Sequence, residues 1–261
     1  MPNPKLKLGK KPAVAIVGFG RFGRTLHRLL RDDFALTVYS RTKPTLDLKE
    51  KTAGTKIAES LSEVYQCPTV FFCVPIQSFE AVIKEHKPYF LNHLLIDTLS
   101  VKMHPAKIFK KYLRGTKATA ILTHPMFGPD SSRNGFAGLP LVLNQFTAGD
   151  KEYQYWKKYF TRQHLKIIEL SAAEHDHLAA NSQGLTHLIG RLLEEMRFTE
   201  TLIDTVGAKK LHEVQNQIGH NTWELFVGLE TYNPYAKKMR RQFDKAYNRL
   251  CQKLKREEKG D

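Results

Sequence analysis

Two polar residues, Ser100 and His124, each follow a run of apolar residues typical of a buried strand. An imidazole ionises near neutral pH, so a histidine in such a position suits general acid or base chemistry. Pro125 restricts the backbone of His124 to extended geometry, which holds the ring in place. We therefore expect His124 to take a hydroxyl proton during hydride transfer from an alcohol carbon, with Ser100 orienting that hydroxyl or the imidazole. A histidine with a purely structural role is the alternative.

A glycine motif follows the first apolar segment of the chain, residues 13–17. Gly18, Gly20 and Gly23 have the spacing G-x-G-x-x-G, and a helix-period pattern comes next, as in a dinucleotide-binding strand–turn–helix. Gly18 allows a tight turn, Gly20 lets the backbone approach a pyrophosphate, and Gly23 lets the helix pack closely on the strand. The predicted cofactor contacts also include the intervening residues Phe19, Arg21 and Phe22. A glycine-rich turn in another α/β fold is the alternative.

The residues that end the second predicted strand, 35–39, indicate which cofactor is bound. An NAD-binding unit usually carries Asp or Glu there for the ribose 2′-hydroxyl. This chain carries Ser40, Arg41 and Thr42 instead, followed by Lys43. A carboxylate would repel a 2′-phosphate, whereas Arg41 can stack on adenine and pair with the phosphate, so the sequence favours NADP over NAD. If Arg41 is merely exposed, the site is indifferent to the 2′-phosphate.

Strand and helix patterns alternate through the first part of the chain. Strands are predicted at 69–74, at 94–102 (running into polar residues), and at 118–122, 139–143 and 166–170, and helices at 77–86 and 104–113. This alternation predicts an α/β fold with a Rossmann-type, doubly wound parallel sheet. Ligands of such sheets lie outside the carboxyl ends of the strands. We therefore expect Cys73, Val74 and Pro75 to border the cofactor, and Asn144 is a candidate for contacting the substrate.

The composition changes after residue 170, where strand patterns cease. A capping-box pattern at Ser171–Glu174 opens a long predicted helix that ends near Met196, and further helices are predicted at 199–216, 221–231 and 234–258. On the long helix, one face is apolar and the other carries Gly184, His187 and Arg191. We expect a dinucleotide-binding domain over residues 1–170 and a helical substrate and dimerisation domain over residues 171–261.

The composition limits the class of protein. Lys and Arg number 41 against 26 Asp and Glu, a net charge of +15, and this positive field attracts phosphorylated cofactors and dicarboxylates. No nucleic-acid motif accompanies the charge, so no nucleic-acid partner is expected. The three cysteines show no metal-ligand spacing and suggest a reducing compartment. With no membrane-length apolar run and no signal-peptide pattern, we expect a cytoplasmic protein with neither membrane nor metal.

The chain resembles the prephenate/arogenate dehydrogenase family of tyrosine biosynthesis. The similarity covers most of the chain, and residues 224–233 resemble the last helices of plant-like arogenate dehydrogenases. The matching segments are the glycine motif, Asp97-Thr-Leu-Ser-Val-Lys102, Thr123-His-Pro-Met-Phe-Gly-Pro129, Glu174-His-Asp-His177 and Leu185-Thr-His187.

The resemblance implies an oxidative decarboxylation of prephenate or arogenate to 4-hydroxyphenylpyruvate or tyrosine. NADP would take the hydride, and the ring carboxylate would leave as CO₂. His124 would polarise and deprotonate the 4-hydroxyl, Ser100 would hydrogen-bond in the same cluster, and His187 would contact a substrate carboxylate. The resemblance also implies a homodimer formed through the C-terminal helices.

One departure from the family leaves the substrate open. Many prephenate-specific members carry an arginine shortly before the segment that matches residues 222–226, and this chain has Gln217 there. Arg191, Lys209 or Lys210 could supply the charge, without a motif match. An anionic side chain near the group that distinguishes the two substrates would favour arogenate and a neutral one prephenate. Asn144 is a candidate for that position.

Two other functions are compatible with the glycine motif. Another NADP-dependent oxidoreductase with a helical C-terminal domain, such as a β-hydroxyacid dehydrogenase, would use a lysine on the long helix. Residues 171–196 contain no lysine. A non-enzymatic dinucleotide sensor would not need a histidine at the end of a strand.

Overall fold

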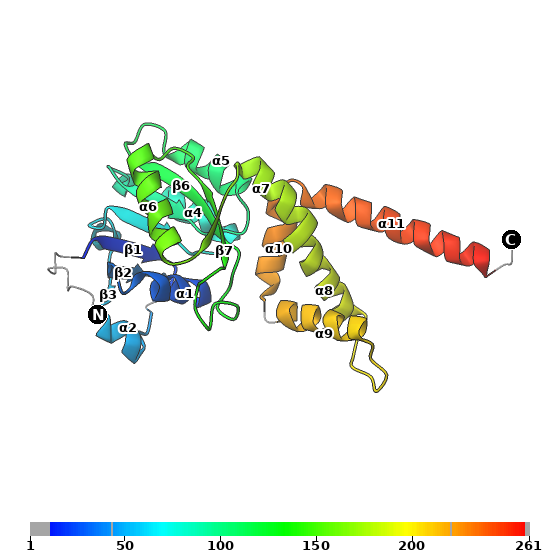
Figure 1. Cartoon of the computed structure of the whole chain (residues 1–261). Helices are drawn as coiled ribbons and strands as arrows, with labels where there is room; N and C mark the ends of the chain where they lie inside the picture. The colour runs from blue at the N-terminus through cyan, green and yellow to red at the C-terminus, as the bar shows by residue number, and fades with distance from the viewer. Residues whose placement is uncertain (1–10, 43, 220, 259–261) are drawn as a thin grey trace. The chain divides into compact units, whose positions relative to one another are not determined.

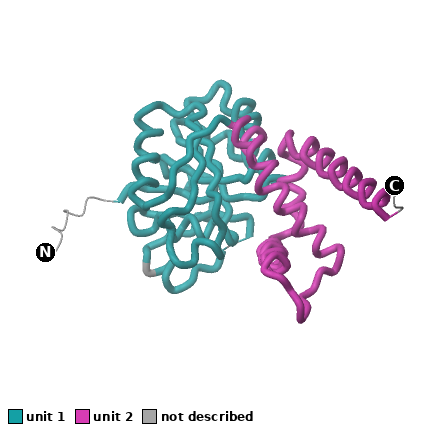
Figure 2. Tube along the Cα trace, turned by 45° about the vertical axis from the view of Figure 1, so that its right-hand side comes forward, with its two compact units in different colours: residues 1–100, 105–171 teal, residues 101–104, 172–261 magenta. Residues whose placement is uncertain are grey.

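The computed structural model describes residues 11–42, 44–219 and 221–258. The chain divides into two compact units (Figure 2). Unit 1 comprises residues 1–100 and 105–171, and unit 2 comprises residues 101–104 and 172–261. Lys43 and the basic residues that precede Lys11 lie outside the described residues.

Within the described residues, unit 1 holds one eight-stranded sheet with the order β3-β2-β1-β4-β5-β6-β7-β8 (Figure 1). The strands are β1 (Ala13–Val17), β2 (Ala35–Tyr39), β3 (Lys56–Ile57), β4 (Thr69–Phe72), β5 (Leu94–Asp97), β6 (Thr119–Pro125), β7 (Pro140–Asn144) and β8 (Lys166–Glu169). Neighbouring strands are parallel except for β6 and β7, which are antiparallel. The predicted doubly wound, mainly parallel sheet is confirmed, and the reversal at β7 is a difference from the prediction.

The connection between β6 and β7 explains this reversal. A parallel crossover needs a dozen or more residues and usually contains a helix. Residues 126–139 form turns rather than a helix, and Gly135 and Gly138 in this connection have positive φ values. The chain therefore returns beside β6 in the opposite direction. Between β7 and β8 the connection contains the helix α6 (Asp150–Arg162), and β8 is parallel to β7.

Helices cover both faces of the sheet. Besides α6 they are α1 (Arg21–Leu30), α2 (Leu48–Thr52), α3 (Leu61–Val64), α4 (Ile76–His86), the 3₁₀ turn η1 (Lys87–Tyr89) and α5 (Met103–Tyr112). Phe71 of β4 packs edge-on against Trp156 of α6, whereas Phe72 packs against Phe79 of α4 and Phe109 of α5. Successive side chains of a strand point to opposite faces, so α6 lies on one face and α4 and α5 on the other.

Unit 2 is helical. Its elements are α7 (Ala172–Ala179), the π-helical segment η2 (Ala180–Gly184), α8 (Leu185–Glu195), α9 (Val206–Gly219), α10 (Trp223–Tyr232) and α11 (Ala236–Glu257). Helices α8 and α9 approach closely at Gly190, where an added Cβ would lie 2.7 Å from Cγ1 of Ile218. Among the described residues, no helix has both the length and the apolar character needed to cross a membrane.

Two predictions for the helical part need correction. The long helix predicted from Ser171 to Met196 is helical over Ala172–Glu195, but the π-helical segment interrupts its α-helical period. The helix predicted at 199–216 begins only at Val206. Asp204 accepts hydrogen bonds from Thr201, and Thr205 Oγ1 accepts the Ala208 N–H. Such local side-chain bonds compete with helix formation in the residues before Thr205 and favour a helix that starts after it.

Candidate active site

The glycine turn of unit 1 follows β1 at the point where the strand order reverses. Strand β1 lies between β2 and β4, and doubly wound sheets bind their ligands at such a switch point. Gly18 has φ +92°, and a Cβ there would lie 2.4 Å from the Cys73 carbonyl oxygen at the end of β4. A Cβ on Gly23 would lie 2.1 Å from the Gly18 oxygen. Both positions therefore require glycine for close packing of the backbone.

Gly20 differs from the other two glycines because the described residues leave the space beside it open. No atom among them lies within 4 Å of an added Cβ at Gly20, which is the N-cap residue of α1. The cap makes no side-chain hydrogen bond, and the first turn of α1 contains no acidic residue. The N-terminal N–H groups and the positive end of the helix dipole suit a phosphate at this position. The turn therefore fits the pyrophosphate of a dinucleotide.

The other predicted cofactor residues border this turn or follow it. Phe19 is buried and packs against His27 of α1, while Arg21 is exposed and pairs with Asp130 at 2.9 Å. Phe22 lies close to Phe127, the residue that follows Met126 in the loop after β6, with 6.4 Å between ring centroids. The glycine turn and the loop after His124 are therefore in contact within unit 1.

The residues after β2 reach the surface. Arg41 and Thr42 are exposed, and Ser40 is half-buried. The nearby segment is tied to α1 by Arg24, whose guanidinium donates to Glu50 at 2.6 Å and to the Thr45 oxygen at 2.7 Å. Arg41 is thus free of a described ion pair and accessible from solvent.

The residues after β4 close the other side of the glycine turn. Burial raises the pKa of the Cys73 thiol to about 12, so the thiol is neutral near pH 7 and does not act as a nucleophile. Thr98 donates a hydrogen bond to its sulfur. Val74 touches the turn through its side chain, since Cγ1 lies 3.0 Å from the Cβ position of Gly18. Pro75 is the N-cap residue of α4.

His124 lies within β6 rather than in the loop that follows it, which corrects the sequence prediction. Strand β5 ends at Asp97, which pairs with Leu122, so the last three residues of β6 extend beyond it. His124 pairs with Val142 on the antiparallel strand β7 and is 2 % exposed. The reversed strand therefore supports the end of β6 from one side and fixes the backbone of His124.

Asp97 joins the two strand ends that carry Ser100 and His124. Its carboxylate accepts the Leu99 N–H at 3.1 Å and the Thr123 N–H at 3.3 Å. Ser100 directly follows Leu99, and His124 directly follows Thr123. Asp97 is fully buried, so these bonds lie in a low-dielectric environment where they are strong. Asp97 lies within a segment that resembles the family, but the sequence alone indicates no role for it.

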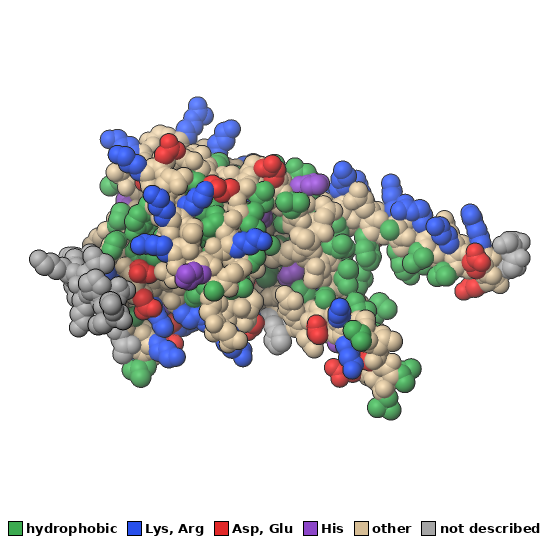
Figure 3. Space-filling model, in the orientation of Figure 1, with side chains coloured by type: hydrophobic (Ala, Val, Ile, Leu, Met, Phe, Trp, Pro, Cys, Tyr) green, Lys and Arg blue, Asp and Glu red, His purple; other side chains and the backbone are tan. Residues whose placement is uncertain are grey.

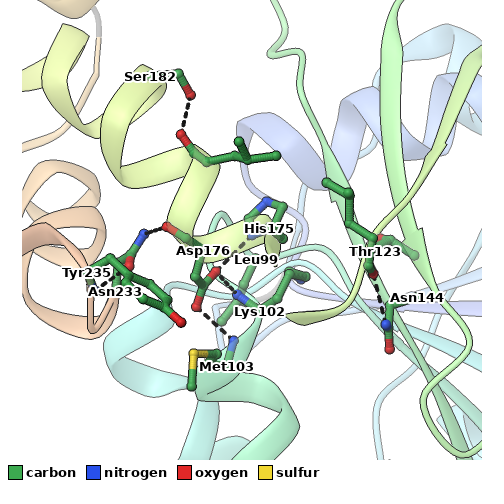
Figure 4. Close-up of polar contacts among 12 residues, drawn as sticks. Leu99, Lys102, Met103, Thr123, Asn144, His175, Asp176, Ser182, Asn233 and Tyr235 are labelled. Atoms are coloured by element: carbon green, nitrogen blue, oxygen red, sulfur yellow. Dashed lines mark hydrogen bonds and ion pairs between the residues drawn. The ribbon is translucent and has the colours of Figure 1, made fainter. Parts of the chain in front are cut away.

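A second buried carboxylate holds the residues that follow Ser100. Asp176 of α7 accepts the main-chain N–H groups of Lys102 at 2.6 Å and Met103 at 2.9 Å (Figure 4). His175 Nδ1 bonds the same carboxylate at 2.8 Å, and Asn233 donates to the Asp176 carbonyl. Asp176 therefore satisfies N–H groups at the start of α5. The adjacent acidic and basic residues at 174–177 were the only sequence signal for this cluster.

The other two residues predicted to contact the substrate are Asn144 and His187. Asn144 ends β7, where its amide nitrogen donates to the Leu170 carbonyl (Figure 4). Its side-chain oxygen accepts the Phe146 N–H. His187 is a buried residue of α8 in unit 2, and burial together with the nearby Arg191 lowers its pKa to about 4. Its imidazole is therefore neutral near pH 7.

A doubly wound sheet with this glycine turn, and a buried histidine on an extended strand of the same unit, is typical of a nicotinamide-dinucleotide-dependent dehydrogenase. Residues 23–169 match the family model for the nucleotide-binding domain of prephenate dehydrogenase, and residues 192–261 match a TYRAAT1-like C-terminal domain. The chain belongs to the prephenate/arogenate dehydrogenase family, whose members are oxidoreductases.

Individual relatives agree with this assignment. The chain is 32% identical to arogenate dehydrogenase 2, chloroplastic, of Arabidopsis thaliana over 92% of the chain and 69% of that protein. It is 31% identical to arogenate dehydrogenase 1, chloroplastic, of the same plant, over 94% of the chain and 40% of that protein. A structure of Aquifex aeolicus prephenate dehydrogenase with hydroxyphenyl propionate and NAD+ is 17% identical, with a TM-score of 0.70 over 97% of this chain and 94% of that one.

Proposed function

We propose that the protein catalyses the oxidative decarboxylation of prephenate or arogenate in tyrosine biosynthesis. Family membership supports this activity. The presence of a glycine turn suited to phosphate and of a buried histidine in the same unit supports it too. In this proposal unit 1 is the dinucleotide-binding domain, and the helices of unit 2 contribute to substrate binding and dimerisation.

In this mechanism His124 takes the proton of the 4-hydroxyl group. Ser100 hydrogen-bonds in the same cluster and orients the hydroxyl or the imidazole. Asp97 fixes the main chain next to both residues through Leu99 and Thr123. A nicotinamide cofactor, when bound, accepts the hydride from the ring carbon that bears the hydroxyl. Loss of the ring carboxylate as CO₂ then leaves an aromatic ring, which makes the reaction strongly favourable.

The observation that carries the proposal is the tethering of the Ser100 turn and of His124 to the same buried carboxylate, Asp97. An assay of NADP and NAD reduction with prephenate and with arogenate tests it directly. We expect absorbance of the reduced cofactor with at least one of the two substrates. The absence of reduction with every combination, by a folded protein that binds the dinucleotide, would refute the proposal.

NADP is the proposed cofactor. The exposed Arg41 stands where an NAD-binding unit usually carries a carboxylate, and α1 carries no acidic residue in its first turn. The Cys73, Val74 and Pro75 segment closes the opposite side of the turn and is proposed to border the nicotinamide half. The substrate role of Asn144 stays a prediction. In the structure its side-chain amide bonds main-chain groups.

A homodimer through the C-terminal helices completes the proposal. On α11, Tyr247, Leu250 and Leu254 are exposed and share one helix face, and Figure 3 shows Lys and Arg side chains along another edge of this helix. An exposed apolar stripe of this kind is typical of a helix that packs against a partner. A cytoplasmic location stays a prediction from the sequence, and the Arabidopsis relatives are described as chloroplastic.

A further inference from the structure

An exposed ion pair joins the first residue of α1 to the turn that follows β6. Nη2 of Arg21 donates to Oδ2 of Asp130 at 2.9 Å, and more than half of each side chain is exposed. Arg21 directly follows Gly20, the N-cap residue at which the turn fits a pyrophosphate. Both residues of the pair belong to unit 1. The pair therefore brings a carboxylate close to the proposed phosphate site.

The turn that carries Asp130 is anchored by a different arginine of the same helix. Nη2 of Arg28 donates to the main-chain oxygen and to Oγ of Ser132, both at 2.7 Å. Ser132 is fully buried, and its hydroxyl donates to the Gly128 carbonyl at 2.8 Å. The guanidinium carbon of Arg28 also lies 5.0 Å from the centre of the Phe136 ring, within the range of a cation–π contact. These contacts hold the turn on α1 independently of Asp130.

The ion pair between Arg21 and Asp130 is weak enough for a ligand to displace. Exposed ion pairs contribute little free energy, because water screens the charges and two long side chains lose freedom. A pyrophosphate offers Arg21 charge-assisted hydrogen bonds of the same kind. The N–H groups and the helix dipole at the start of α1 bind the pyrophosphate in addition. A dinucleotide at Gly20 therefore competes successfully with Asp130 for the guanidinium.

We propose that Asp130 occupies the Arg21 guanidinium in the free protein and yields it to the cofactor pyrophosphate, which lowers the affinity for the dinucleotide. This inference rests on the proposed function, which supplies the dinucleotide. Arg21 is then a cofactor-binding residue, and Asp130 is a positioning residue that acts through it. Oδ1 of Asp130 lies 3.8 Å from Nη2 of Arg133, so the released carboxylate keeps a basic neighbour. The competition favours release of the cofactor after each turnover.

Titration of the protein with NADP, without substrate, tests the proposal. Asp130→Asn removes the competing charge and should lower the Kd about two- to fivefold, as for one exposed ion pair. Arg21→Gln removes a charged contact to the pyrophosphate and should raise the Kd roughly tenfold. In the double variant the gain from Asp130→Asn should vanish, so that the Kd stays within about twofold of that of Arg21→Gln. If Asp130→Asn fails to tighten binding, or tightens it equally with and without Arg21, the proposal fails.

Arg133→Gln is the matched control. Arg133 is another exposed basic neighbour of Asp130, but it lies on the turn and not on α1. The Kd for NADP should therefore stay within about twofold of the wild-type value. All variants should unfold near the wild-type temperature, since exposed ion pairs add little stability. A rise in Kd in Arg133→Gln as large as that in Arg21→Gln would show a general effect of charge and overturn the proposal.

Parallel titrations with NAD identify the phosphate that Arg21 meets. The pyrophosphate is common to both cofactors, so Asp130→Asn should lower the two Kd values by the same factor. An effect on NADP alone would place the 2′-phosphate at Arg21 and overturn the proposal. The expected Kd changes without any turnover would refute only the proposed function. Normal turnover with an unchanged Kd in Asp130→Asn would refute only the role of Asp130.

Discussion

Thr123 and Asp97 are joined by two hydrogen bonds at the end of the sheet. The Thr123 hydroxyl donates to the Asp97 carbonyl at 2.6 Å, and the Thr123 N–H donates to the Asp97 carboxylate at 3.3 Å. Both residues are buried, and one of them directly precedes His124. The strand end that carries the proposed base is therefore fastened by side-chain contacts, where the β5–β6 ladder has already ended.

Thr123→Val should weaken this attachment without changing the side-chain shape. We expect a loss of about 1 kcal/mol in the free energy of unfolding, because one net hydrogen bond is removed. A fall in kcat should accompany it, since His124 loses a fixed backbone. Thr119→Val, on the same strand, is the matched control, because the Thr119 hydroxyl donates an exposed hydrogen bond to Glu152 of α6. Equal kcat values for the two variants would contradict a positioning role of Thr123.

His124→Asn should remove the general base. We expect kcat to fall by about 10²–10⁴-fold, the usual contribution of general-base catalysis. Affinity for NADP should change little, because the glycine turn binds the cofactor. The profile of kcat/KM against pH should also lose its acidic limb, which reports protonation of the base in the free enzyme. Circular dichroism checks the fold, and a folded variant with nearly normal kcat would exclude His124 from the mechanism.

Gly20 and Gly23 should respond to alanine in opposite ways. At Gly23 an added methyl group would meet the Gly18 oxygen at 2.1 Å, so Gly23→Ala should lower the free energy of unfolding by about 1–3 kcal/mol. At Gly20 the space is open, so Gly20→Ala should unfold at the wild-type temperature and yet bind NADP at least about tenfold more weakly. Thermal melts with and without NADP distinguish the two effects. Unchanged NADP affinity in Gly20→Ala would place the pyrophosphate elsewhere.

Arg41→Asp should reverse the charge that the 2′-phosphate meets. We expect NADP to bind roughly ten- to a hundredfold more weakly, while NAD is affected less, so that the gap between the cofactors narrows. Titration of wild type and variant with both dinucleotides provides the measurement. If wild type already binds NAD as tightly as NADP, the proposed preference is wrong.

Leu185→Lys should disturb assembly if the C-terminal helices form the dimer. Leu185 is partly buried on α8, and a lysine there would bring an unpaired charge into an apolar contact. Light scattering at micromolar concentration should give a dimer for wild type and a smaller species for a folded variant. A wild-type mass near 30.0 kDa would show a monomer and end the dimer proposal.

The sequence predicts the sheet well because its central strands are apolar on both faces. The four residues of β4 are all buried, and such continuous runs bounded by helical patterns are typical of doubly wound folds. The direction of β7 could not be predicted, because buried parallel and antiparallel strands have the same apolar pattern. Only the turn-rich, helix-free connection at 126–139 distinguishes them, and its glycines are the signal that was available.

The site was predictable where the chemistry lies in a local motif. The glycine turn and the position of His124 near a strand end follow from spacing alone. The roles of Asp97 and Asp176 do not, because their partners are main-chain N–H groups. Any residue offers such a donor, and Asp176 meets its partners 74 and 73 positions away in the sequence. When a buried carboxylate binds the main chain, the sequence contains no characteristic partner residue that would reveal the contact.

The number of residues in the π-helical segment Ala180–Gly184 determines the direction in which the side chains after it point. A π turn holds about one residue more than an α turn, and each residue of an α-helix turns the chain by about 100°. Deleting a single residue from this segment would restore a regular helix and swing His187 and Arg191 together to another side, with their own neighbours on α8 unchanged. The deletion or insertion of a single codon in this segment would therefore change their orientation as much as a substitution would.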